Sequence, residues 1–94
     1  MKRFYVLFKG RVQGVGFRWT LVTIAHKYSI TGYCKNKENG DVEAQIQGNK
    51  DNLDAFMKEI LMAKTYIRID DYAIKEIDIK EDEKSFEVKF WSDT

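Results

Sequence analysis

The chain has 94 residues, 44% of them hydrophobic and 33% charged, and its formal net charge is +1. This length allows one hydrophobic core, so we expect a single domain over residues 1–94. The near-neutral charge argues against non-specific nucleic-acid binding, and no apolar run approaches the ~18 residues that a membrane-spanning helix needs. One cysteine cannot form an internal disulfide, and the N-terminus lacks a signal-peptide pattern, so we expect a cytoplasmic protein.

Two elements and a turn are predicted in the first part of the chain. Residues 3–9 alternate in polarity like a strand, and residues 17–28 have the period of an amphipathic helix. The apolar face of this helix consists of Phe17, Leu21, Ile24 and Tyr28. The turn between the strand and the helix is rich in glycine.

A hairpin and a second helix follow. Residues 30–37 and 41–47 read as strands, and the Asn39-Gly40 pair between them favours a tight turn because it accepts positive φ. In the second strand, Val42, Ala44 and Ile46 face one way. The next helix has an apolar stripe, for which Asn49 or Asp51 can supply the N-cap; the stripe consists of Leu53, Phe56, Met57, Ile60 and Leu61.

The last third predicts a terminal hairpin, with strands over 72–79 and 86–91 and a polar turn over 80–84. Its many acidic residues suggest a solvated face. The order strand, helix, strand, strand, helix, strand, with one further strand, predicts an α+β ferredoxin-like sandwich. In this fold two helices cover one face of an antiparallel sheet.

The turn before the first helix has the features of a phosphate-binding loop. Gly14 and Gly16 allow backbone conformations that aim N–H groups at an anion near a helix N-terminus, and Arg18 adds a planar, permanently charged fork. Basic residues crowd this part of the chain, namely Lys2, Arg3, Lys9, Arg11 and Arg18. A Walker loop needs Gly-Lys-Ser or Gly-Lys-Thr here, and a dinucleotide fingerprint needs a small residue where Trp19 stands. From the glycines alone, an ordinary strand-to-helix turn is an equally open reading.

Two ungapped blocks resemble the signatures of the acylphosphatase family. The first is Gly10-x-Val12-Gln13-Gly14-Val15-x-Phe17-Arg18, and the second is Gly32-Tyr33-Cys34-Lys35-Asn36, followed by Gly40-Asp41-Val42 and Gly48. The resemblance covers nearly the whole chain, and it independently implies the ferredoxin-like fold. It also implies hydrolysis of acyl phosphates, with Arg18 and Asn36 as the catalytic residues. Phosphate would then be held by backbone N–H groups of Gln13, Gly14, Val15, Gly16, Phe17 and Arg18.

Each catalytic candidate also has an ordinary interpretation. Arg18 could be a solvated arginine, although a cation in a first helical turn is mildly unfavourable unless an anion binds there. Asn36 could be a turn-initiating residue. The resemblance implies instead that its amide holds the attacking water, with the substrate phosphate as the proton acceptor. We interpret His26 as a favourable cation at a helix C-terminus and Cys34 as a buried packing residue.

The expected chemistry needs few groups. The leaving group of an acyl phosphate is a carboxylate with a pKa near ~4, so it departs without a strong general acid. No residues stand at the spacing of a metal site. We therefore expect no metal and no cofactor, a small-molecule acyl phosphate as substrate, and phosphate or sulfate as competing anions. We expect a monomer without a nucleic-acid or membrane partner.

Three binding modules are the alternatives. An RNA-recognition domain shares the element order but needs stacking aromatics on its third strand, where this chain has none. A copper chaperone needs a pair of cysteines. A phosphate sensor or carrier would not need Asn36.

Overall fold

The computed structural model describes residues 1–14, 16–63 and 67–90. Val15 of the predicted phosphate loop and Trp91 of the predicted last strand lie outside these residues. The elements in chain order are β1 (Lys2–Arg11), α1 (Phe17–Lys27), β2 (Thr31–Asn36), β3 (Val42–Gly48), α2 (Lys50–Leu61), β4 (Arg68–Ile77) and β5 (Phe86–Lys89).

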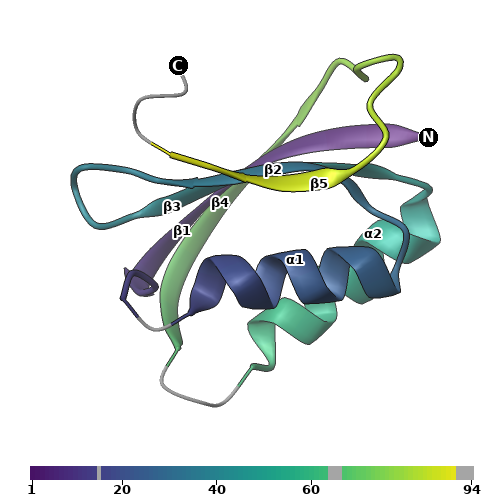
Figure 1. The fold of residues 1–94 in the computed structure, drawn as a ribbon. Helices are drawn as coiled ribbons and strands as arrows, with labels where there is room; N and C mark the ends of the chain where they lie inside the picture. Colours follow the sequence, from purple (N-terminus) through teal and green to yellow (C-terminus); the bar gives the residue numbers. More distant parts are fainter. Residues whose placement is uncertain (15, 64–66, 91–94) are drawn as a thin grey trace.

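The strands form one sheet in the order β4-β1-β3-β2-β5, and both helices lie on the same face of it (Figure 1). The pairs β1–β3, β1–β4 and β2–β3 are antiparallel. The predicted ferredoxin-like sandwich is therefore confirmed. Since β5 runs parallel to β2, the sheet is mixed rather than wholly antiparallel.

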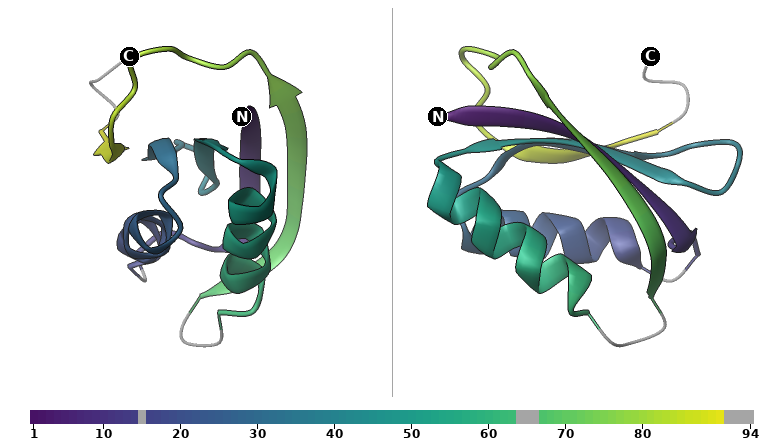
Figure 2. Two further views of the ribbon diagram at one scale, coloured as in Figure 1. Left: turned by 90° about the vertical axis from the view of Figure 1, so that its right-hand side faces the viewer. Right: turned by 180° about the vertical axis from the view of Figure 1, so that it is seen from behind.

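The predicted terminal hairpin is wrong. β4 pairs with β1 at one edge of the sheet, and β5 pairs with β2 at the opposite edge. The connection between them crosses the face of the sheet that the helices leave uncovered (Figure 2, left). Local alternation predicts a strand well, but the partner of a strand is set by the rest of the sheet.

The core fills the space between the sheet and the helices. The predicted inward residues of β3, Val42, Ala44 and Ile46, are fully buried. Leu61 differs from the prediction because it is 39% exposed; it is the last residue of α2 and lies one helical step of about 100° beyond the buried Ile60. The other buried side chains of the two helices are Phe17, Leu21, Ile24, Ala25, Leu53 and Phe56.

β1 is longer than predicted and takes in Gly10 and Arg11, so the loop before α1 is short. The sheet register shifts between Lys9 and Gly10. Gly10 has a φ of 131°, and a Cβ built there would lie 2.2 Å from the carbonyl oxygen of Arg68. This glycine therefore permits the close approach of β4 rather than contact with a ligand.

No helix within the described residues has the length and apolar character needed to span a membrane.

Candidate active site

The loop between β1 and α1 leaves the N-terminus of α1 accessible. Gly14 and Gly16 have φ values of 72° and 77°, and apart from the adjoining residues no described atom lies within 4 Å of a Cβ built at either position. These glycines are needed for their left-handed conformation and not for space. Gly16 is the N-cap of α1; no side chain of the described residues caps the helix, and its first turn carries no acidic residue. The helix dipole and its first N–H groups therefore favour an anion here.

A pocket of about 200 Å³ lies at this helix start and brings the two predicted catalytic residues together. Arg18 comes from the first turn of α1, and Asn36 comes from the last position of β2. The other described residues around the pocket are Val12, Gly14, Gly16, Phe17 and Trp19. Two of them, Val12 and Phe17, are buried and anchor the loop in the core. The volume corresponds to several water molecules at about 30 Å³ each, which suits a single phosphoryl group.

The Arg18 side chain has no ion pair with any described carboxylate. Its guanidinium carbon lies 5.8 Å from the centre of the Phe90 ring, just after β5. This cation–π contact helps to hold the guanidinium, and no carboxylate of the described residues compensates its charge. The fork is thus suited to an incoming phosphoryl group.

Asn36 carries an unusual polar atom. Its side-chain Oδ1 is buried and has no hydrogen-bond partner among the described residues. Buried acceptors are nearly always hydrogen-bonded in folded proteins, because an unpaired one is costly. This oxygen is therefore suited to accept a hydrogen bond from a water or a ligand in the pocket.

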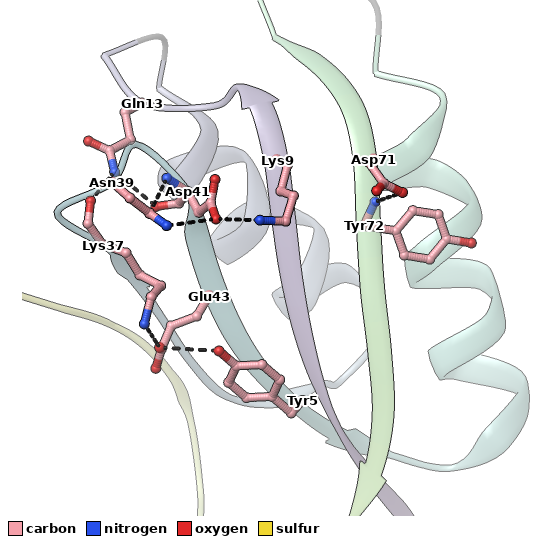
Figure 3. A network of polar contacts seen from close by, with 9 residues as sticks. All are labelled: Tyr5, Lys9, Gln13, Lys37, Asn39, Asp41, Glu43, Asp71 and Tyr72. Carbon is pink, nitrogen blue, oxygen red and sulfur yellow. Dashed lines mark hydrogen bonds and ion pairs between the residues drawn. The ribbon is translucent and has the colours of Figure 1, made fainter.

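Gln13 is the residue whose role the sequence did not indicate. We expected a contribution from its backbone, but its side-chain Nε2 donates to the carbonyl oxygens of Lys37 and Asp41, at 2.7 and 2.8 Å. These carbonyls belong to the turn between β2 and β3 (Figure 3). No local signal identifies such a contact, since the acceptors lie 24 and 28 residues further along the chain.

Hydrogen bonds within the turn between β2 and β3 hold its shape. The Lys37 N–H donates to the Asp41 carbonyl at 2.8 Å, and Gly40 N–H donates to the Lys37 carbonyl at 3.2 Å. Of the Asn39-Gly40 pair, only Gly40 has a positive φ; Asn39 instead accepts a hydrogen bond from the Asp41 N–H. The predicted hairpin is confirmed, but the turn is held by a side chain as well as by glycine.

Other predicted features lie away from the pocket. Lys9 pairs with Asp41 at 3.0 Å, and Arg3 is buried at the far end of β1, so the basic cluster does not converge on the site. His26 is exposed in the last turn of α1, which is the position predicted for it. Tyr33, from the second family block, is not among the residues that line the pocket, and its hydroxyl donates to Glu43 at 3.0 Å.

Cys34 is fully buried beside the site, and its thiol lies 3.8 Å from the Arg18 carbonyl oxygen. Burial raises the pKa of this thiol to about 12, against the opposing effect of the Arg18 charge. A thiol with so high a pKa is a poor nucleophile. The prediction that it serves for packing is in keeping with this environment.

A larger open groove of about 550 Å³ lies between the helices, lined by Ile24, Tyr28, Met62 and neighbouring residues. Among its described lining residues there is neither the first residue of a helix nor a buried polar atom without a hydrogen-bond partner. Within the described residues, no three His, Cys, Asp or Glu side chains are grouped so that they could hold a metal ion. The small pocket thus has the more specific chemistry.

Comparison with known proteins agrees with this geometry. Residues 4–88 match the family model described as Acylphosphatase. The chain is 39% identical to an acylphosphatase of Clostridium acetobutylicum over 90 residues, covering 96% of this chain and 99% of that protein. It is 38% identical to an acylphosphatase of Geobacillus kaustophilus over 92 residues, covering 98% of each chain. The crystal structure of acylphosphatase from Bacillus subtilis superposes with a TM-score of 0.89 at 28% identity, covering 95% of this chain and 99% of that one. The chain therefore belongs to the acylphosphatase family.

Proposed function

We propose that this protein is an acylphosphatase enzyme, which hydrolyses the carboxyl–phosphate bond of small acyl phosphates to a carboxylate and inorganic phosphate. One observation carries the proposal above all. In a chain of this family, Arg18 and Asn36 line the same small pocket at the open start of α1. An anion-binding module would use the arginine but has no need of the asparagine.

The phosphoryl group binds at the N-terminus of α1. Backbone N–H groups of residues 13–18, Val15 included, surround its oxygens, and the Arg18 fork binds two of them. Among the described residues, no side chain caps the start of α1 and no carboxylate pairs with Arg18, which supports this role. In phosphoryl transfer such positioning and charge stabilisation supply most of the catalysis.

Asn36 holds the attacking water. Its Oδ1, which has no partner among the described residues, accepts a hydrogen bond from the water. The water oxygen then bonds to phosphorus as the bond from phosphorus to the acyl oxygen breaks. The substrate phosphate takes up the proton of the water. The leaving carboxylate has a pKa near ~4 and departs as an anion, so the site needs no general acid.

The proposal also covers the oligomeric state, location and ligands of the protein. Residues 1–94 act as a single acylphosphatase domain and as a monomer in the cytoplasm. The reaction uses no cofactor or metal ion and involves neither nucleic acid nor a membrane. Inorganic phosphate and sulfate compete with the substrate for the loop and Arg18.

A hydrolysis assay tests the reaction. The protein should hydrolyse an aryl acyl phosphate and act poorly on an aryl phosphate monoester, because a less acidic leaving group needs a proton donor that the site lacks. Activity should survive exhaustive chelation. Equal rates on both substrates, or activity that returns only with a divalent ion, would contradict the proposal.

Two substitutions test the residue roles. Asn36→Ala should lower kcat by on the order of 10²–10³, as the loss of one positioned polar group does, while competitive inhibition by phosphate stays nearly unchanged. Arg18→Lys keeps the charge but loses the fork, so turnover and phosphate inhibition should both weaken. Lys35→Ala is the matched control, since neighbouring residues of a strand point to opposite faces. Near-normal turnover of folded Asn36→Ala would refute the role of that residue.

A further inference from the structure

The side chain of Gln13 joins the two halves of the pocket. Its Nε2 group has two hydrogens, and both are used: one for the carbonyl of Lys37 at 2.7 Å and one for the carbonyl of Asp41 at 2.8 Å. A carbonyl oxygen can only accept, so the amide nitrogen and not its oxygen must face this pair.

The two acceptors lie close to Asn36, one along the chain and the other across the strand pair. Lys37 directly follows Asn36, and Asp41 directly precedes Val42, which is the residue paired with Asn36 across the β2–β3 ladder. Gln13 is the first residue of the phosphate loop and lies just after the buried Val12. A single side chain thus fastens the start of the loop to the end of the strand pair that carries Asn36.

The turn on which Gln13 docks does not depend on it for its own closure. Each carbonyl accepts a backbone N–H as well, from Gly40 for Lys37 and from Lys37 for Asp41. The Asp41 carboxylate is further held by Lys9 at 3.0 Å and by Asn39 at 3.2 Å (Figure 3). Loss of the Gln13 bonds would therefore leave the turn formed and free the loop to shift against it.

We propose that Gln13 is a positioning residue, which sets the distance between the phosphate loop with Arg18 and the water-holding amide of Asn36. This inference rests on the proposed function. The phosphoryl contacts all belong to the loop and α1, whereas the water contact belongs to β2. A shift between the two parts would leave phosphate binding intact and spoil the alignment of the water, and a misplacement of about 1 Å can cost ~10²-fold in rate.

Gln13→Glu is the most direct test, because it keeps the shape of the side chain but presents an ionised, acceptor-only group to two carbonyl oxygens. We expect kcat to fall about 10- to 100-fold, while the inhibition constant of inorganic phosphate changes by less than about 3-fold. Gln13→Met, without the added charge, should give the same split if the glutamate variant does not fold. Asn39→Ala, which weakens the turn internally and spares the Gln13 bonds, should keep kcat within about 3-fold.

A double-mutant cycle separates positioning from a structural effect. In the Asn36→Ala background the Gln13 substitution should change kcat by less than about 2-fold, because it acts through Asn36. An equal loss in both backgrounds would overturn the proposal, as would a loss of phosphate binding as large as the loss of kcat.

A second readout does not depend on activity. The side-chain amide resonance of Asn36, identified by its absence in Asn36→Ala, should shift or broaden in Gln13→Met, in free protein and with inorganic phosphate. An unchanged resonance would count against the inference. If the unmodified protein hydrolyses no acyl phosphate, the proposed function falls, while this measurement still decides whether Gln13 positions Asn36.

Discussion

At the scale of the residue, Cys34 has a measurable consequence. Its thiol is buried against α1, and burial raises its pKa to about 12 from an ordinary value of 9.0. The folded protein therefore keeps a proton that the unfolded chain releases above pH 9.0. The resulting stability is present below that pH and is lost as the pH rises toward about 12, at about 1.4 kcal/mol per pH unit.

Cys34→Ala should accordingly flatten the alkaline loss of stability. The variant should be less stable than the parent by about 1 kcal/mol near pH 8, through the lost side-chain volume, and this difference should shrink or reverse near about pH 10.5. Urea unfolding at the two pH values measures it. Burial and Glu43 also raise the pKa of Tyr33 to about 12, but that group is present in both proteins and cancels in the comparison. A constant difference at both pH values would disprove the assignment.

At the scale of the element, the two helices begin in opposite ways. The start of α2 is closed, because Asn49 Oδ1 accepts a hydrogen bond from the Asn52 N–H at 2.8 Å and Asp51 adds a negative charge in the first turn. The start of α1 has Gly16 in place of a capping side chain, and its first turn carries no acidic residue. The N-terminus that no described side chain caps is thus the one that lies at the pocket. Its N–H groups are suited to bind an anion that enters the pocket.

Asn49→Ala should therefore lower the free energy of unfolding by about 1 kcal/mol and leave kcat unchanged, because the lost cap belongs to the helix remote from the pocket. Asn52→Ala is the matched control, since it keeps the N–H that the cap accepts and should cost at most a few tenths of that amount. Denaturant unfolding and the acyl phosphate assay together test this. A fall in kcat after Asn49→Ala would show that α2 contributes to the site.

At the scale of the whole molecule, a buried clamp holds the long connection from β4 to β5 across the open face of the sheet. Arg3 is only 2% exposed and binds both carboxylate oxygens of Glu83, at 2.7 and 3.2 Å. Gln47 bonds the backbone of Lys80 through its amide oxygen and nitrogen. The acidic segment that we expected to be a solvated face is thus partly a counter-charge for a buried arginine.

Glu83→Ala should be costly, because it leaves the Arg3 charge buried without its partner. We expect a loss of about 3–5 kcal/mol in the free energy of unfolding. Glu76→Ala removes the carboxylate of the exposed pair with Lys2, 4.0 Å apart, and should change stability by less than about 1 kcal/mol. Urea unfolding measures both. If the two substitutions lower the free energy of unfolding equally, the pair of Arg3 and Glu83 contributes no more to stability than an exposed ion pair.

The sequence by itself determined the features that depend on residues close together in the chain, namely the helices, most strands and the glycine-rich loop before α1. Periodicity placed the first helix and the first three strands to within two residues at each end, and the apolar stripe of the second helix lies inside α2, because burial of one face requires it. Both family blocks identified Arg18 and Asn36, which line one pocket. The positive φ of Gly14 and Gly16 was also foreseeable, since only glycine adopts it readily.

Only the tertiary structure decided which distant parts meet. Alternation could not tell that β5 pairs in parallel with β2 instead of closing a hairpin with β4, because strand pairing is a long-range choice. Gln13 and Arg3 looked like a loop residue and a basic residue near an anion site. Their partners lie 24 to 80 residues away in sequence, so only folding joins Gln13 to the β2–β3 turn and Arg3 to Glu83.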